Sequence, residues 1–180
     1  PAWSVVRPYA AGGEAGWDLR LGTFASLEAQ CAAIADDIAY NTHDLDDGLR
    51  AGLLTFDMLR GVPLAGEALA IVDDHYPGLD DGRRAHEMTR RVMTAMVEDV
   101  IAETASNLDR KIPQSVADIH DAGETLARFS AAMAEREAGL KRFLFEHLYR
   151  HEEVMRVRAQ AEAVVHDLFR RFTRSPSLMG

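Results

Sequence analysis

Residues 26–52, SLEAQCAAIADDIAYNTHDLDDGLRAG, indicate an α-helical fold for this chain. It opens with Ser26, a residue type that caps helix N-termini, and continues through strong helix formers, so it predicts one long helix. On a period of 3.6 residues, apolar side chains recur along one side of this helix and should face a core. They are Leu27, Cys31, Ile34 and Ile38.

A second stripe lies on the opposite side of the same helix and is largely acidic. Its members are Asp36, Tyr40, His43, Asp44 and Asp47. Most charged stripes on helices are simply solvated, which is one interpretation. Small apolar residues on the same side favour another, in which a packed surface places the carboxylates to bind a cation or a sugar hydroxyl. Those small residues are Ala29, Ala32 and Ala33. Periodicity alone leaves both interpretations open.

The string IADDIAYNTHDLDDGLRAG closely resembles the second-half signature of the HD-domain deoxynucleoside triphosphate triphosphohydrolases, the dGTPase-like family. The likeness continues through MTRRVMTAMVEDVIAET, FSAAMAEREAGLKRFLFEHLYRH and VMRVRAQAEAVVHDLF, and so covers nearly the whole chain. The first motif is highly specific, whereas the later ones are mostly helix-packing patterns. Members of this family cut a dNTP into a deoxynucleoside and intact triphosphate. Their metal is held by a histidine, a contiguous histidine-aspartate pair and a distant aspartate.

The resemblance implies roles for three residues of the acidic stripe. Asp36 matches the distant aspartate and would be a ligand of Mg²⁺ or Mn²⁺, while Tyr40 and Asp44 match positions that face the deoxyribose. The dipeptide formed by His43 and Asp44 is not the diagnostic pair, because it follows the metal aspartate by about two helical turns. We therefore expect this chain to be the C-terminal part of such an enzyme, without the upstream catalytic groups and inactive alone. The opening Pro1, in place of methionine, agrees with that expectation.

The composition sets limits on the protein class. The chain has 180 residues, 47% of them hydrophobic, which is enough for one sizeable core. A net charge of −9 argues against a surface that binds nucleic acid. The one cysteine, Cys31, rules out an internal disulfide. No signal peptide and no long apolar run is evident, so we predict a cytoplasmic protein without a membrane segment.

The remaining sequence predicts an all-α, multi-helix bundle of roughly six to eight helices. We expect residues 1–25 to be irregular, with a short extended piece near residues 17–21. We expect residues 26–175 to form a single helical domain and residues 176–180 to form a loose tail. Helices are predicted from Thr55 to Gly61, from Pro63 to about His75, and from residue 80 or 81 to about 108. Others should start at Ser115, at about residue 124, and at about residue 152, the last ending near residue 174.

Two clusters of basic residues have alternative interpretations. Arginines suit phosphate oxygens, but we favour a solvated basic face paired with the many carboxylates. The first cluster comprises Arg83, Arg84, His86, Arg90 and Arg91. In the second, His147 and His151 are four residues apart, as metal ligands can be, but no third ligand is evident and helix-end histidines are favoured.

Two functions of different class follow. In the first, the chain is part of a metal-dependent phosphohydrolase that acts on a dNTP such as dGTP. In the alternative, it is a helical oligomerisation or interaction module with no chemistry of its own. Family members tend to form closed oligomers, so we expect a homo-oligomer, and the two interpretations can both hold.

Overall fold

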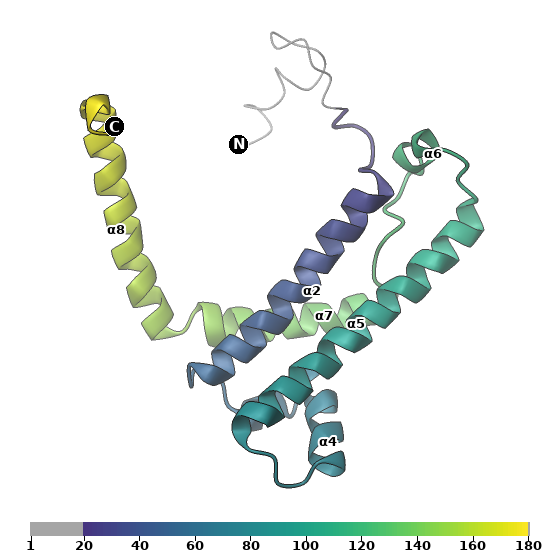
Figure 1. Cartoon of the computed structure of the whole chain (residues 1–180), viewed down its shortest axis with the longest axis horizontal. Helices are drawn as coiled ribbons and strands as arrows, with labels where there is room; N and C mark the ends of the chain where they lie inside the picture. The colour runs from purple at the N-terminus through teal and green to yellow at the C-terminus, as the bar shows by residue number, and fades with distance from the viewer. Residues whose placement is uncertain (1–19, 180) are drawn as a thin grey trace. The chain divides into compact units, whose positions relative to one another are not determined.

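The computed structural model describes residues 20–179, and every regular element in that range is helical (Figure 1). The all-α prediction is therefore confirmed. Helix α2, Leu27–Arg50, forms where the opening stretch predicted it, and the backbone N–H of Ala29 donates to Ser26 Oγ at 3.3 Å. The other elements are α3 Phe56–Leu59, α4 Ala65–His75, α5 Asp81–Lys111, α6 Val116–His120, α7 Ala131–Leu144, the π-helix η2 Phe145–Tyr149, α8 Glu152–Arg174 and the 3₁₀-helix η3 Pro176–Met179.

The chain groups into two compact units. In the described part, unit 1 comprises residues 20–39 and 94–133, and unit 2 comprises residues 40–93 and 134–179. Helices α2, α5 and α7 each contribute one segment to each unit. The prediction of one helical domain over residues 26–175 stays a prediction. Most of the predicted irregular segment, residues 1–19, lies outside the described residues, and η3 forms where a loose tail was expected.

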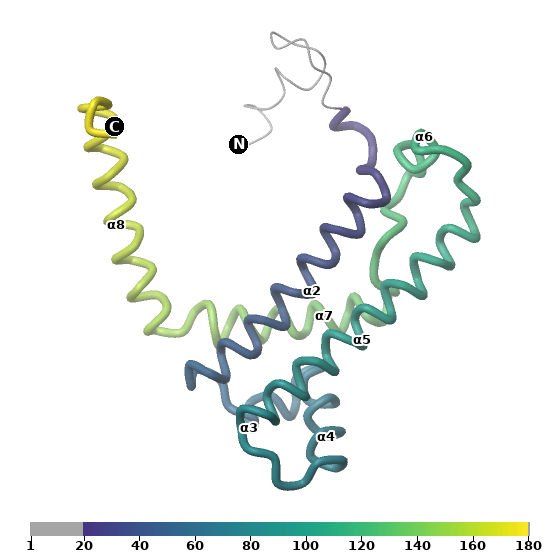
Figure 2. The backbone as a smooth tube through the Cα atoms, viewed as in Figure 1, coloured from purple at the N-terminus to yellow at the C-terminus, as the bar shows by residue number. Residues whose placement is uncertain are grey.

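In unit 2, α3 and α4 lie beside the N-terminal part of α5 (Figure 2). Thr55 caps α3 as predicted, since its side chain accepts from the N–H of Met58. The Arg84 guanidinium of α5 donates two hydrogen bonds of 2.7 Å to Asp73 of α4 and stacks over the Phe56 ring of α3 at 4.3 Å. One forked side chain thereby joins three helices around the buried residues Leu59, Leu69 and Met88.

A buried polar pair joins α2 to α7 within unit 2. Asn41 is 1% exposed, and its Nδ2 donates to Glu137 Oε1 at 2.8 Å. Lys141 Nζ lies 2.7 Å from the same oxygen. A buried amide without a partner is costly, so this pair favours one register of α2 on α7. The face of α2 on which Tyr40 and Asp44 lie is fixed by that register.

In unit 1, a side chain distant in sequence overrides the prediction of a helix from residue 124. Gln30 Oε1 accepts from the backbone N–H groups of Leu126 at 2.7 Å and Ala127 at 3.1 Å. These N–H groups are therefore engaged outside any helix, and α7 begins only at Ala131. Ser130 precedes it and donates both its N–H, at 2.8 Å, and its hydroxyl, at 2.6 Å, to Asp99 of α5.

Two residues predicted on apolar faces are exposed. Cys31 of α2 is exposed although Ile38 on the same stripe is buried, and Ile101 of α5 is 64% exposed although Val100 beside it is buried. The helical period was right, but the buried side of α2 runs through Gln30 and Ile38, with Leu27 and Ile34 half-buried, so that Cys31 lies at the edge of this side. Among residues 20–179, none of the helices combines the length and the apolar character needed to span a bilayer.

Candidate functional site

Asp36, Tyr40 and Asp44 lie on one helix at intervals of four residues, so they follow one side of α2 as predicted. Asp36 is exposed, and Tyr40 is 58% exposed. Asp44 differs from both, because it is half-buried. The acidic stripe is therefore neither wholly solvated nor wholly packed, and its packed part is at Asp44.

The contact that half-buries Asp44 comes from Tyr149, 105 residues later in the chain. The Tyr149 hydroxyl donates a hydrogen bond to Asp44 Oδ2. Its ring lies 6.3 Å from the Tyr40 ring, centroid to centroid, at an interplanar angle of 56°. Unit 2 thus brings together a cluster of two phenols and one carboxylate: Tyr40, Asp44 and Tyr149.

Sequence reasoning missed Tyr149. The signal was the string LYRH within a segment that looked like an ordinary amphipathic helix. In the structure the segment is the π-helix η2, in which the N–H of Arg150 donates to the carbonyl of Phe145 at 3.2 Å. Single π turns widen a helix locally and are frequent at functional sites. Here the wider turn buries Leu148 and still lets its neighbour Tyr149 reach α2.

The electrostatics of this cluster keep Tyr149 a hydrogen-bond donor. Burial, followed by the hydrogen bond to Asp44, raises the pKa of Tyr149 well above the ordinary tyrosine value of about 10. The hydroxyl therefore stays protonated across the physiological pH range. It engages Oδ2 of Asp44, and an ionised carboxylate has a second oxygen with which to accept a hydrogen bond from a ligand.

The two histidines of the second basic cluster are placed as helix-end residues. His147 packs its ring against Phe143 at 4.7 Å, and His151 is the N-cap of α8, accepting from the N–H of Glu153 at 3.3 Å. The prediction that favoured helix-end histidines over metal ligands agrees with these contacts. Within residues 20–179, no three His, Cys, Asp or Glu side chains gather in a group that could hold a metal ion. Asp36 contributes a single carboxylate.

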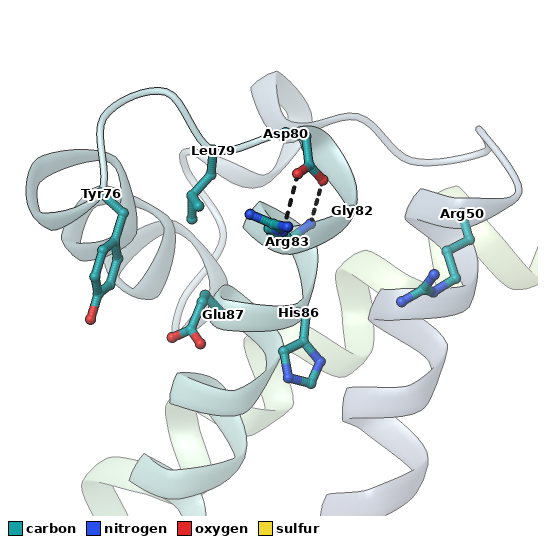
Figure 3. Close-up of a pocket in the computed structure, with 8 residues that line it drawn as sticks. All are labelled: Arg50, Tyr76, Leu79, Asp80, Gly82, Arg83, His86 and Glu87. Carbon is teal, nitrogen blue, oxygen red and sulfur yellow. Dashed lines mark hydrogen bonds and ion pairs between the residues drawn. The ribbon is translucent and has the colours of Figure 1, made fainter.

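The basic cluster of α5 borders a hollow of about 460 Å³ in unit 2 (Figure 3). It is lined by Arg50, Tyr76, Leu79, Asp80, Gly82, Arg83, His86 and Glu87. Its arginines are paired with carboxylates. Arg83 Nε lies 3.4 Å from Asp80, and Arg50 Nε lies 2.5 Å from Asp46. Of the predicted basic cluster, Arg83, Arg84 and Arg90 each have a carboxylate partner, in agreement with the favoured interpretation of a basic face paired with carboxylates.

Known proteins that are similar to this chain in sequence share one family name. Residues 127–180 match the phosphohydrolase-associated domain. A deoxyguanosinetriphosphate triphosphohydrolase-like protein of Mesorhizobium japonicum is 60% identical over 162 residues, which are 90% of this chain and 40% of that protein. The chain belongs to the deoxyguanosinetriphosphate triphosphohydrolase-like family. A member from Agrobacterium fabrum is 56% identical over the same length, and one from Brucella ovis is 55% identical over 163 residues.

These relatives confirm the family resemblance that the α2 motif suggested. The chain spans about 40% of the length of the curated relatives it matches. The identity extends over nine-tenths of this chain, so it covers far more than the α2 motif alone. The roles of Asp36, Tyr40 and Asp44 stay predictions.

Proposed function

We propose that this chain is part of a metal-dependent phosphohydrolase that converts a dNTP such as dGTP to a deoxynucleoside and triphosphate. The observation that carries the proposal is the cluster of Tyr40, Asp44 and Tyr149 in unit 2. Two of its members, Tyr40 and Asp44, lie on the α2 stretch that resembles the family signature, and the relatives of this chain are named for deoxyguanosinetriphosphate triphosphohydrolase. Because the proposed substrate is a dNTP, we also propose that the activity is cytoplasmic.

The cluster has the groups that a deoxyribose needs. Asp44 accepts a hydrogen bond from the 3′-hydroxyl through one oxygen, while Tyr149 holds the other and so fixes the carboxylate plane. Tyr40 keeps more than half of its surface exposed and offers a flat ring beside the sugar. A carboxylate that is already oriented loses little freedom when the sugar binds, which favours affinity and a defined position of the substrate.

Asp36 lies two helical turns before Asp44 on the same side of α2 and supplies one hard oxygen ligand. The donors among residues 20–179 do not complete a metal site, so the other ligands must come from elsewhere in the intact protein. When bound, Mg²⁺ or Mn²⁺ would polarise the α-phosphate and lower the pKa of the attacking water. In this proposal, the cluster of Tyr40, Asp44 and Tyr149 holds the sugar, and Asp36 supplies one ligand of the metal.

The reaction is tested by identifying products. The intact protein is incubated with dGTP and Mn²⁺, and the phosphorus products are separated by ion exchange. We expect deoxyguanosine and inorganic triphosphate in equal amounts. Release of orthophosphate or pyrophosphate, or no turnover of any dNTP, would overturn the proposal.

The role of Asp36 is tested with a neighbouring control. Asp36→Ala should abolish hydrolysis in the intact protein, whereas Asp37→Ala, the same change one residue away on α2, should retain it. The melting temperature of Asp36→Ala should stay close to that of wild type, because the Asp36 side chain is exposed. Equal activity of the two variants would show that Asp36 is an inert surface residue.

A further inference from the structure

Gly48 is the one glycine inside helix α2, and its position there is buried. Glycine in the middle of a helix is less favourable than alanine, because the unfolded chain has more conformational freedom at a glycine. Gly48 lies four residues after Asp44, so the two residues share one side of α2. Close packing of other side chains around Gly48 offsets its local cost.

Two buried leucines occupy the space in which a side chain at position 48 would lie. A Cβ added to Gly48 would be 2.6 Å from Leu54 Cδ1, 2.9 Å from Leu54 Cγ and 3.4 Å from Leu148 Cδ1. Non-bonded carbon atoms pack at about 3.5–4.0 Å, so the Leu54 side chain would have to move. Leu54 is 2% exposed and Leu148 is 8% exposed, so neither side chain has open solvent beside it.

The backbone of Leu54 is tied to Gly48 itself. The N–H groups of Leu53 and Leu54 both donate to the carbonyl oxygen of Gly48 at 3.0 Å. These bonds fold the chain that follows α2 back over Gly48, and Gly52 has a φ of 69° in the turn between them. Because hydrogen bonds hold Leu54 in place, an added methyl group would push its side chain towards Leu148 of η2.

Leu148 directly precedes Tyr149 in η2. Leu148 packs over Gly48, and Tyr149 donates its hydrogen bond to Asp44, one turn earlier on α2. These two contacts are about 6 Å apart along α2, from four residues at about 1.5 Å each. A displacement of Leu148 therefore also displaces Tyr149, and a hydrogen bond that lengthens beyond about 3.5 Å is effectively lost.

We infer that Gly48 is a positioning residue for the carboxylate of Asp44. The absence of a side chain at position 48 lets η2 lie close enough to α2 for Tyr149 to hold Asp44. This inference rests on the proposed function, in which Asp44 binds the 3′-hydroxyl of the deoxyribose. Gly48 has no side chain with which to contact a substrate, and it acts through Leu148 and Tyr149.

The first test is the preference of the intact protein for the 3′-hydroxyl. We expect kcat/KM of wild type to be about tenfold higher on dGTP than on its 2′,3′-dideoxy analogue, and Gly48→Ala should lower this ratio to about threefold or less. The control is Gly66→Ala, whose added Cβ would meet backbone atoms of Leu59 and Arg60. It also strains the fold but should keep the wild-type ratio. A Gly48→Ala variant with the wild-type ratio would overturn the inference.

Two further variants keep the test decisive if Gly48→Ala does not fold. Leu148→Ala removes the other side of the contact without adding an atom, and it should also lower the ratio to about threefold or less. In Gly48→Ala/Leu54→Ala the added methyl group has room, so the ratio should return to about tenfold although the protein has lost a core side chain. A merely structural role of Gly48 predicts no such recovery. An unchanged ratio in Leu148→Ala would overturn the inference.

A double-mutant cycle in stability separates failure of this inference from failure of the proposed function. In urea titrations of the intact protein, Tyr149→Phe should lower the folding equilibrium constant about fivefold. It should have almost no effect in a Gly48→Ala or Leu148→Ala background, in which the bond to Asp44 is already lost. Equal effects in all backgrounds would overturn the inference. Loss of the effect in a protein whose wild type shows no preference for the 3′-hydroxyl would support the positioning of Asp44 by Gly48 and refute the proposed function.

Discussion

Replacing Tyr149 by phenylalanine removes one hydroxyl and leaves the ring beside Tyr40 in place. The lost bond runs to a carboxylate, and bonds to charged groups contribute about 1.5–3 kcal/mol when buried. Tyr149 and Asp44 are each half-buried, so water replaces part of the lost interaction and the expected cost is about 1 kcal/mol. A chain of 180 residues unfolds with an entropy of about 380 cal/mol/K, so the melting temperature should fall by about 2.5 °C.

The pH dependence distinguishes this bond from general loss of packing. The pKa of Tyr149 is raised in the folded state, so its contribution to stability is complete below about pH 10, the unfolded value. The contribution is lost as the pH rises above 10 towards the folded value. Urea unfolding of both proteins should therefore show a difference of about 1 kcal/mol at pH 7 that shrinks above pH 10. Other groups that titrate in this range are common to both proteins and cancel in the difference.

A matched control is available in Tyr76→Phe, because Tyr76 is 45% exposed and contacts its neighbours through the ring. That variant should stay within about 0.5 kcal/mol of wild type at every pH. Equal stability of Tyr149→Phe and wild type at pH 7, or a difference unchanged at high pH, would refute the assignment of Tyr149 as the donor that holds Asp44.

Three further predictions concern the scaffold. Glu137→Ala leaves the buried Asn41 amide without its acceptor and should lower the free energy of unfolding by about 2 kcal/mol in urea titrations. Gly66→Ala would place a Cβ 2.4 Å from the Arg60 carbonyl oxygen, and this backbone atom cannot easily move away. The variant should therefore lower the free energy of unfolding by about 2 kcal/mol in the same assay. Hydrogen bonds from Arg110, then Lys111, lower the pKa of Glu124 to about 2, so its carboxyl should titrate near that pH by NMR and its pairs should weaken only as the pH falls towards 2.

The controls for these predictions lie close to each site. Glu135→Ala removes an exposed carboxylate of α7 and should be nearly neutral. Gly61→Ala meets no atom within 4 Å and should cost little. Arg110→Ala should raise the pKa of Glu124. If Glu137→Ala or Gly66→Ala is as stable as its control, the corresponding contact does not stabilise the fold. If the pKa of Glu124 is unchanged in Arg110→Ala, the hydrogen bond from Arg110 does not lower it.

Helix boundaries follow from the sequence where local chemistry decides them. Ser115 forms a capping box with Asp118 at the start of α6, and α8 begins and ends where its pattern and Ser175 predicted. The start of α7 could not be found in this way. Gln30, 96 residues upstream of Leu126, accepts backbone hydrogen bonds that a helix over that segment would have used. No local pattern records such a contact.

The candidate site divides in the same way. The helical period predicts that Asp36, Tyr40 and Asp44 share one side of α2, whereas their roles come from the family resemblance and stay predictions. Tyr149 could not, because an α-helical reading of its segment gives no indication of the π turn that brings it to Asp44. Exposure was also mispredicted for Cys31. The period shows which residues share a side of a helix but does not show where the centre of the buried side lies, and here Gln30 beside Cys31 is the buried residue.

The proposed binding of the deoxyribose by Asp44 on α2 can be tested by combining a change in the protein with a change in the substrate. The intact protein and its Asp44→Ala variant are each assayed on dGTP and on the 2′,3′-dideoxy analogue, which lacks the 3′-hydroxyl. We predict that wild type loses about tenfold in kcat/KM on the analogue, while the variant treats both nucleotides almost equally. An Asp44→Ala variant that keeps the wild-type preference for the 3′-hydroxyl would show that Asp44 does not bind this group.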